Sequence, residues 1–299
     1  MSVDDAHRLE TAIRAARAGG QLALSRLGDP GYQKWKGPRD LLAEAVLDVQ
    51  ARVLDTIRQE FPDDRVLLEE TEAPPAGLDS EQGEAEGDAR ADPLWIVDPL
   101  DGSVNFIAGF PVFAVAVGYR AEGVYRVGVV YDPCRDELFQ AVVGGGAFLN
   151  GQRIGVRQIA DTYEALRSAM VGTDWLGDDD EVKKALQVGR FVADQVLQVR
   201  MLGSPALGLC YVACGRLHAY YGLGPLRLWD IAAGVVILHE AGGYASDIDG
   251  EDWAFGGEGC LATNGGIHQR LLAVVSPVRK LQRLDREAAQ TNLPTESKK

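Results

Sequence analysis

Apolar side chains recur at helical spacing in several long stretches of the 299-residue chain. The last of these stretches stops at Gly242-Gly243, a pair that is typical of a helix C-terminus. Between the helical stretches lie short apolar runs of strand length, and the two kinds of element alternate without an internal repeat, which indicates the α+β class. The pattern predicts helices over 5–27, 40–60, 103–107, 181–197, 205–214 and from Ile231, and strands ending at Glu69 and Asp98 and over 112–120, 124–131, 137–142 and 199–202.

The run WIVDPLDGSVNF at 95–106 carries the most chemical information. Its apolar half ends in DPLDGS, which predicts a strand that delivers the carboxylates of Asp98 and Asp101 into a tight turn. Carboxylate oxygens are the ligands that Mg²⁺ prefers in proteins. The backbone N–H groups of Gly102 and Ser103 follow at a predicted helix start, where a phosphate can bind. The alternative interpretation is an Asp-rich turn in which Asp101 caps the helix.

Two further segments supply acidic residues. Residues 228–243 read LWDIAAGVVILHEAGG and place Asp230 at the start of a predicted helix, where it either presents a carboxylate to a metal ion or acts as an ordinary N-cap. Residues 66–71 read VLLEET, so Glu69 and Glu70 end another apolar strand. Alone, such a pair is as consistent with a solvated surface as with a ligand set.

In order and spacing, these segments resemble the motifs of the inositol monophosphatase family of Mg²⁺-dependent, lithium-sensitive phosphatases. The family pattern is a Glu-Glu pair, a W-I-x-D-P-x-D-G-[ST]-x-N-F run, and a W-D-x-A-[AG] run that ends in E-A-G-G. The resemblance extends over roughly residues 5–275. It implies a layered αβαβα sandwich of the inositol monophosphatase/fructose bisphosphatase type. It also implies an N-terminal α+β half at 1–150 and a C-terminal α/β half at 151–276, followed by a polar tail at 277–299 that we expect to be partly disordered.

The resemblance implies a site between the halves that holds two or three Mg²⁺ ions. One ion would be bound by Glu69, Asp98 and the Leu100 carbonyl, and a second by Asp98, Asp101 and Asp230. Two ions that share a ligand can activate a water and stabilise the leaving oxygen. Glu70 either holds a metal-bound water or is structural. The catalytic residues implied are Glu69, Asp98, Asp101, Ser103 and Asp230.

Residues that bind the phosphate and the substrate are implied in the same way. The N–H groups of Gly102 and Ser103 would hold the phosphate. The segment RMLGSPALGLC at 200–210 resembles the family stretch R-x-x-G-[ST]-x-A-x, which lines the substrate side of the cleft. On the residues alone, Ser204 is equally well explained as a helix N-cap. The substrate-binding residues implied are Gly102, Ser103, Gly203, Ser204, Ala206 and Asp230.

The chain departs from the family pattern in the first long helix. Family members have the signature D-L-V-T-x-x-D, and here Ala43 replaces its hydroxyl and Val46 its second carboxylate. In the family that carboxylate pairs with the motif hydroxyl, here Ser103, to prepare the attacking water. Loss of such a relay costs about 10²–10⁴ in rate. On a helix, Glu44 and Asp48 point away from the Val46 face and do not replace it.

A second departure concerns substrate choice. Inositol-specific members have a Glu after an A-Y-Y run, but here Tyr221 is followed by Gly222. A site without that acid gives up discrimination for ring hydroxyls, so inositol monophosphate is not expected as the sole substrate. The sequence predicts a Mg²⁺-dependent phosphomonoesterase that hydrolyses a small phosphorylated metabolite, inositol monophosphate-like, a sugar phosphate or similar, by metal-activated water. The alternative is a catalytically impaired family member that binds metal and a phosphorylated ligand.

Composition limits the partners. The net charge of −14, with six acids against one Arg at 77–92, disfavours binding of a nucleic-acid polymer through its phosphates. No apolar run reaches membrane-spanning length, and the first residues lack signal-peptide features. The four cysteines form no C-x-x-C pair, so a zinc site is not predicted. We expect a soluble, cytoplasmic protein without a membrane partner, and the resemblance implies a homodimer.

Overall fold

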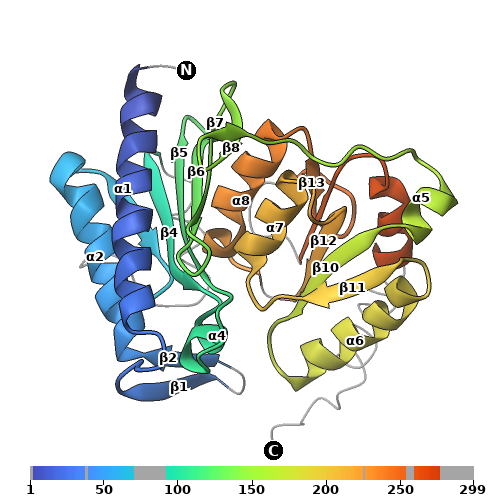
Figure 1. Cartoon of the computed structure of the whole chain (residues 1–299), viewed down its shortest axis with the longest axis horizontal. Coiled ribbons are helices and arrows are strands. Elements are labelled where there is room, and N and C mark those ends of the chain that lie inside the picture. Colours follow the sequence, from blue (N-terminus) through green and yellow to red (C-terminus); the bar gives the residue numbers. More distant parts are fainter. Residues whose placement is uncertain (1–2, 38–39, 71–91, 225, 254–258, 277–299) are drawn as a thin grey trace, which may run out of the picture.

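The structure is a computed structural model that describes residues 3–37, 40–70, 92–224, 226–253 and 259–276. Its helices are α1 (Val3–Ser25), α2 (Glu44–Glu60), α4 (Ser103–Ile107), α5 (Tyr163–Arg167), α6 (Asp179–Ala193), α7 (Pro205–Ala213) and α8 (Leu228–Glu240), with a further helical segment at 268–276. Layers alternate across the molecule (Figure 1): α1 and α2, a first sheet, α7 and α8, a second sheet, and finally α5 and α6. This order confirms the expected α+β class and the αβαβα sandwich.

Helices cover both faces of the first sheet. Its strands, in spatial order, are β3 (Arg65–Leu68), β4 (Leu94–Asp101), β5 (Ala114–Ala121), β6 (Val124–Asp132), β7 (Glu137–Val142), β8 (Gly146–Leu149) and β9 (Gln152–Arg153). Strand β3 runs parallel to β4, and the later neighbours pair antiparallel. Side chains alternate between the faces, so Trp95 and Val97 enter the core beneath α1 and α2, while Leu94 and Ile96 enter the core around α7 and α8. The strand therefore reads as a continuous apolar run.

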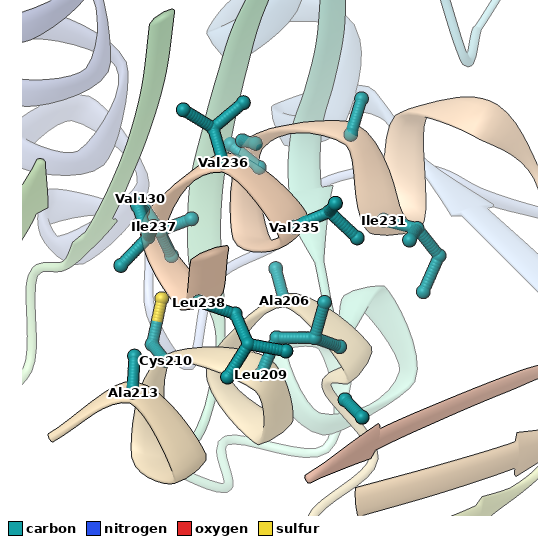
Figure 2. Packing of buried hydrophobic residues seen from close by; sticks show 14 of the residues in the cluster. Val130, Ala206, Leu209, Cys210, Ala213, Ile231, Val235, Val236, Ile237 and Leu238 are labelled. Atoms are coloured by element: carbon teal, nitrogen blue, oxygen red, sulfur yellow. The ribbon is translucent and has the colours of Figure 1, made fainter. Parts of the chain in front are cut away.

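The middle layer is apolar on all sides. Figure 2 shows Leu209 and Cys210 of α7 packed against Ile237 and Leu238 of α8. A helix enclosed by two sheets has no polar face, which explains why both sequences are almost entirely apolar. The backbone of α8 lies directly on β6, because a Cβ at Gly128 would collide with the Ala233 carbonyl. This close contact fixes the middle of α8 relative to the first sheet.

The second sheet lies on the far side of the middle layer. Its strands, in spatial order, are β11 (Gln198–Met201), β10 (Met170–Trp175), β12 (Ala219–Leu223), β14 (Cys260–Thr263) and β13 (Tyr244–Ser246). Strand β10 pairs parallel with β11 and β12. Leu166, Val188 and Leu271 from the outer helical segments pack against it. A separate hairpin joins β1 (Gln33–Gly37) to β2 (Asp40–Ala43).

The structure corrects two predicted helices. Residues 40–43 form strand β2, and α2 begins only at Glu44, whose backbone N–H donates to the Tyr32 carbonyl across the hairpin (2.8 Å). The helix predicted over 181–197 is α6, which starts earlier because the Asp178 side chain caps it, and which ends at Ala193. Strands β10, β12, β13 and β14 were not predicted. The acidic stretch up to residue 91 and the tail from 277 lie outside the described residues.

None of the helices within the described ranges is long and apolar enough to cross a membrane.

Candidate metal centre

Three carboxylates from two distant parts of the chain meet at one point. Asp98 and Asp101 lie at the end of β4, and Asp230 lies in the first turn of α8. One oxygen from each lies within 4.8 Å of the others, a grouping that can hold a metal ion. Asp98 and Asp101 are buried, and Asp230 is half-buried. The structure thus brings together the three aspartates that the sequence singled out.

An irregularity in β4 turns both of its aspartates to this point. Asp98 pairs with Ala116 and Asp101 with Ala114, so β4 has one residue more than β5 in this interval. In a regular strand, residues three apart face opposite sides, and the extra residue restores a common side. Asp98 Oδ1 also accepts a hydrogen bond from the Leu100 N–H (2.9 Å), which shapes the local chain. The expected tight turn is therefore a bulged strand that continues to Asp101.

Asp101 is held by the start of α7. Its Oδ2 accepts hydrogen bonds from the Ser204 hydroxyl and from the Ala206 N–H (3.1 Å). Ser204 is also the N-cap of α7, since its Oγ accepts from the Leu207 N–H (3.4 Å). The two interpretations of Ser204, helix cap and site residue, are therefore compatible. Asp101 itself is not a helix cap, because Gly102 occupies the N-cap position of α4.

Asp230 is the third residue of α8 rather than its N-cap. The N-cap is Arg227, and the Asp230 Oδ2 accepts a hydrogen bond from the Arg227 N–H (2.6 Å). This bond fixes the carboxylate over the first turn, where the positive end of the helix dipole favours an anion. One oxygen of Asp230 thus stabilises the helix start, and the side chain still faces the other two aspartates.

Burial and mutual repulsion make the ionised aspartates unfavourable as they stand. Burial is the largest cause that raises the pKa of Asp98 well above its usual range, followed by the charges of Glu69 and Asp101. Burial also raises the pKa of Asp101, against the Ser204 hydrogen bond, which lowers it. For Asp230, burial and then Glu69 raise the pKa to about 7. A divalent cation would offset this repulsion, and the all-oxygen donor set suits a hard ion such as Mg²⁺.

The Glu-Glu pair lies at the edge of this cluster and is paired with a lysine. Lys36 of β1 places its Nζ 3.3 Å from Glu69 Oε1 and 2.6 Å from Glu70 Oε1. Glu69 is close enough to Asp98 and Asp230 for its charge to raise the pKa of both. Glu70 is buried, and its backbone bonds the Gln50 side chain. Sequence reasoning missed Lys36, since nothing in the letters QKWKG links it to acids more than thirty residues away.

Ala43 and Val46 are buried in the core and offer no polar atom to the site. Each is 1% exposed, and Val46 belongs to the core beneath α1 and α2. The nearby acids are engaged elsewhere: the Asp48 carboxylate pairs with Arg26 (3.1 Å), and Glu44 Oε2 accepts from the Tyr32 N–H (3.4 Å). Neither acid takes the place of the missing carboxylate.

Two residues without an assigned role join the site to the second sheet. Asn105 of α4 donates from Nδ2 to the carbonyls of Val112 and Leu202, both at 2.8 Å. Asp174 of β10 is buried and accepts hydrogen bonds from the Leu202 and Gly203 N–H groups at 3.0 and 2.5 Å. Asn105 was visible within the 95–106 run. Asp174 had no local signal, because its partners lie 28 or more residues away.

Comparison with known proteins agrees with this geometry. A model described as "Inositol monophosphatase family" matches residues 4–280. Inositol monophosphatase 1 of Solanum lycopersicum is 35% identical over 256 residues, which cover 86% of this chain and 90% of that protein. The Nus factor SuhB of Escherichia coli is 36% identical over 245 residues, covering 81% and 85% of the two chains.

A solved structure shows the same fold. The Thermotoga maritima IMPase superposes with a TM-score of 0.79 at 30% identity, covering 92% of this chain and 98% of that one. The match therefore extends over nearly the whole chain rather than over one motif. The chain belongs to the inositol monophosphatase family of phosphatases.

Proposed function

We propose that the protein is a Mg²⁺-dependent phosphomonoesterase that acts on a small phosphorylated metabolite. The observation that carries this proposal is the convergence of Asp98, Asp101 and Asp230, whose oxygens lie within 4.8 Å of one another. Buried carboxylates with raised pKa values are costly without a cation, and a phosphatase of this family would use that cation.

In this proposal the chain supplies ligands from two layers. Asp98 would be a ligand of both ions, Glu69 and the Leu100 carbonyl would complete one set, and Asp101 and Asp230 would complete the other. Glu69 would leave its ion pair with Lys36 when it binds the metal. The bound ions would lower the pKa of a water and stabilise the leaving oxygen. Ser204 and Ala206 hold Asp101 from behind so that its carboxylate keeps one orientation.

The phosphate would bind at the start of α4. Gly102 adopts a left-handed conformation (φ 89°), and a Cβ there would lie 2.9 Å from the Gly203 carbonyl, so no side chain fits between the two segments. The N–H groups of Gly102 and Ser103 are the proposed donors to the phosphate. Ser204 and Ala206 are fully buried, so we propose that they shape the site through Asp101, with Gly203 at the substrate side.

Substrate choice is expected to differ from that of an inositol-specific enzyme. Gly222 follows Tyr221, and a Cβ there would lie 2.6 Å from Leu226 Cδ1, so an apolar side chain fills this corner. A pocket without the ring-binding acid favours no single polyol. We therefore expect several small phosphomonoesters to be accepted, among them sugar phosphates and similar esters.

The test is phosphate release from a panel of phosphomonoesters that includes inositol monophosphate, sugar phosphates, histidinol phosphate and phosphoadenosine phosphate. We expect turnover with Mg²⁺, none with EDTA, and none with Asp98→Asn, which should retain the fold by circular dichroism. Turnover that persists in EDTA or in Asp98→Asn would refute the metal assignment. Mg²⁺ binding without hydrolysis of any ester would indicate an impaired enzyme instead.

Three finer properties are proposed, the first two from the family and the third from the low cysteine content. We expect lithium to inhibit the Mg²⁺-dependent reaction, the protein to form a homodimer by analytical ultracentrifugation, and the enzyme to act in the cytoplasm. The absence of nucleic-acid binding is also proposed, on the net charge of −14. A filter-binding assay with RNA is a direct check.

A further inference from the structure

A buried carboxylate outside the metal centre organises the turn before α7. Asp174 is 2% exposed, and its oxygens accept hydrogen bonds from the turn before α7 and from a neighbouring strand. Its Oδ1 accepts from the backbone N–H groups of Leu202 (3.0 Å) and Gly203 (2.5 Å). Its Oδ2 accepts from the Tyr220 hydroxyl (3.0 Å), which comes from the neighbouring strand β12. The Asp174 carboxylate therefore acts as a hydrogen-bond acceptor for the Leu202–Gly203 turn.

The opposite side of the same turn is held by an amide. Asn105 Nδ2 donates to the carbonyls of Leu202 (2.8 Å) and Gly203 (3.4 Å). Gly203 has a φ of 69°, and a Cβ at that position would lie 2.8 Å from Asn105 Nδ2. The Leu202–Gly203 backbone is thus fixed from two sides. The Asp174 carboxylate accepts hydrogen bonds from its N–H groups, and the Asn105 amide donates hydrogen bonds to its carbonyls. Little freedom remains for the residues that follow.

Those following residues hold a proposed metal ligand. Directly after the turn, the Ser204 hydroxyl and the Ala206 N–H both donate to Asp101 Oδ2. The Tyr220 ring packs directly against α7, because it lies where a Cβ of Gly208 would be. A continuous series of hydrogen bonds therefore runs from Tyr220 through Asp174 and the turn to Asp101.

We propose that Asp174 is a positioning residue: by holding the Leu202–Gly203 turn, it aims the Ser204 and Ala206 donors at Asp101 and so sets the affinity of the centre for its cation. The inference rests on the proposed metal-dependent function. Asp174 does not touch the metal or the substrate, and its own negative charge is not what the turn requires. An acceptor in the right place is sufficient.

A matched pair of variants separates the position of the acceptor from its charge. Asp174→Asn keeps an acceptor oxygen at the turn, and its amide N–H can donate to the Tyr220 oxygen. The asparagine side chain carries no charge. Asp174→Glu keeps the charge but moves the oxygens by one methylene. We expect Asp174→Asn to bind Mg²⁺ within about threefold of wild type and Asp174→Glu to bind about tenfold or more weakly, the range seen when ligand-orienting partners are lost.

The measurement is calorimetric titration of the full-length protein with Mg²⁺ alone, with Asp98→Asn as the binding-deficient control. Tyr220→Phe removes only the bond to the other oxygen and should stay close to wild type. If Asp174→Glu does not fold by circular dichroism, Asp174→Ala replaces it, with the same expected weakening.

Wild-type affinity in Asp174→Glu or Asp174→Ala would overturn the inference, and so would equal weakening in Asp174→Asn, because the charge would then be the cause. A wild-type protein that binds no Mg²⁺ would instead overturn the proposed function, and this inference with it.

Discussion

Asp230 has two tasks that conflict at neutral pH. Its carboxylate caps the first turn of α8 through the Arg227 N–H, which favours the ionised form. Burial and the charge of Glu69 favour the neutral form more strongly and raise its pKa to about 7. In the unfolded chain the same group has an ordinary carboxyl pKa. Without a cation, Asp230 must therefore either bind a proton when the chain folds or remain ionised and be repelled by Glu69.

This conflict predicts a pH-dependent effect of Asp230→Asn. A carboxyl group whose pKa is raised in the folded state stabilises the fold fully at pH values below its unfolded pKa of 3.8. This stabilisation is lost as the pH rises to the folded-state pKa of about 7. In EDTA, the variant should therefore gain stability relative to wild type across this window, by at most about 1.4 kcal/mol per pH unit. Urea denaturation of both proteins at several pH values measures this difference. A difference that does not change with pH would contradict the raised pKa.

Val46 and Ala43 define a second prediction at the residue scale. Restoring the family pair with Val46→Asp and Ala43→Thr should raise turnover by about tenfold or more, because a base can again act on Ser103. The carboxylate enters a position that is 1% exposed, so the double variant should also be less stable. Steady-state kinetics on the preferred ester measure the gain. Ala43→Thr with Val46→Asn is the matched control, and an equal gain in both would show that no base was restored.

The three aspartates of the candidate metal centre were predictable from the sequence, whereas the residues that contact the neighbouring segments were not. Asp98, Asp101 and Asp230 stand in runs whose letters carry both the apolar pattern and the acids. Asp174 and Lys36 acquire their roles from partners in other elements, the Leu202–Gly203 turn and the Glu69–Glu70 pair. A single sequence gives no sign of contacts made across that distance.

At the scale of elements, strand β6 and helix α8 approach so closely that a glycine is required between them. Gly128 of β6 pairs with Gly118 of β5, and both face α8. A Cβ at Gly128 would press on the backbone of Ala233, whereas one at Gly118 would meet the Ala232 Cβ at an ordinary 3.5 Å. The two paired glycines therefore differ in the space between the strand and α8.

We expect Gly128→Ala to lower the free energy of unfolding by about 1–3 kcal/mol, since α8 must move away from the sheet. That movement carries Asp230 away from Asp98, so Mg²⁺ affinity should fall as well. Gly118→Ala is the matched control and should leave both quantities near wild type. Urea denaturation and Mg²⁺ titration measure the two effects. Equal behaviour of the two variants would mean that the spacing of β6 and α8 does not set the site.

Elements with a clear apolar pattern were predicted well even where they are short, since α4 and β7 have the expected bounds. Helix α1 lies within two residues of its expected position, whereas strand β4 continues past its expected end at Asp98 to Asp101. Residues 40–43 were assigned to a helix because apolar spacing over so few residues fits either element, and the hairpin bond from Glu44 to Tyr32 decides it. Strand β12, with the letters AYYGL, becomes a strand through β10 and β14, which lie far away in the sequence.

For the molecule as a whole, the metal centre links the first sheet to the middle layer. A cation that binds only the folded form stabilises it by mass action, by about 2.7 kcal/mol at a hundredfold excess over its dissociation constant. We therefore expect Mg²⁺ to raise the midpoint of urea denaturation and EDTA to reverse the rise. Asp98→Asn should show no such response. A similar rise in the variant would place the stabilising ion elsewhere.

The separation of Asp98 from Asp230 along the chain has a consequence for biosynthesis. The strands β4 to β7 are translated well before α8, so the sheet can form while the helix that covers one of its faces has not yet been made. During that interval Ile96 and Val130, which end in the core around α8, remain uncovered. The nascent chain therefore exposes an apolar surface before α8 has been translated, the kind of surface that chaperones recognise. Docking of α8 buries this surface and brings Asp230 to Asp98 and Asp101 in the same step.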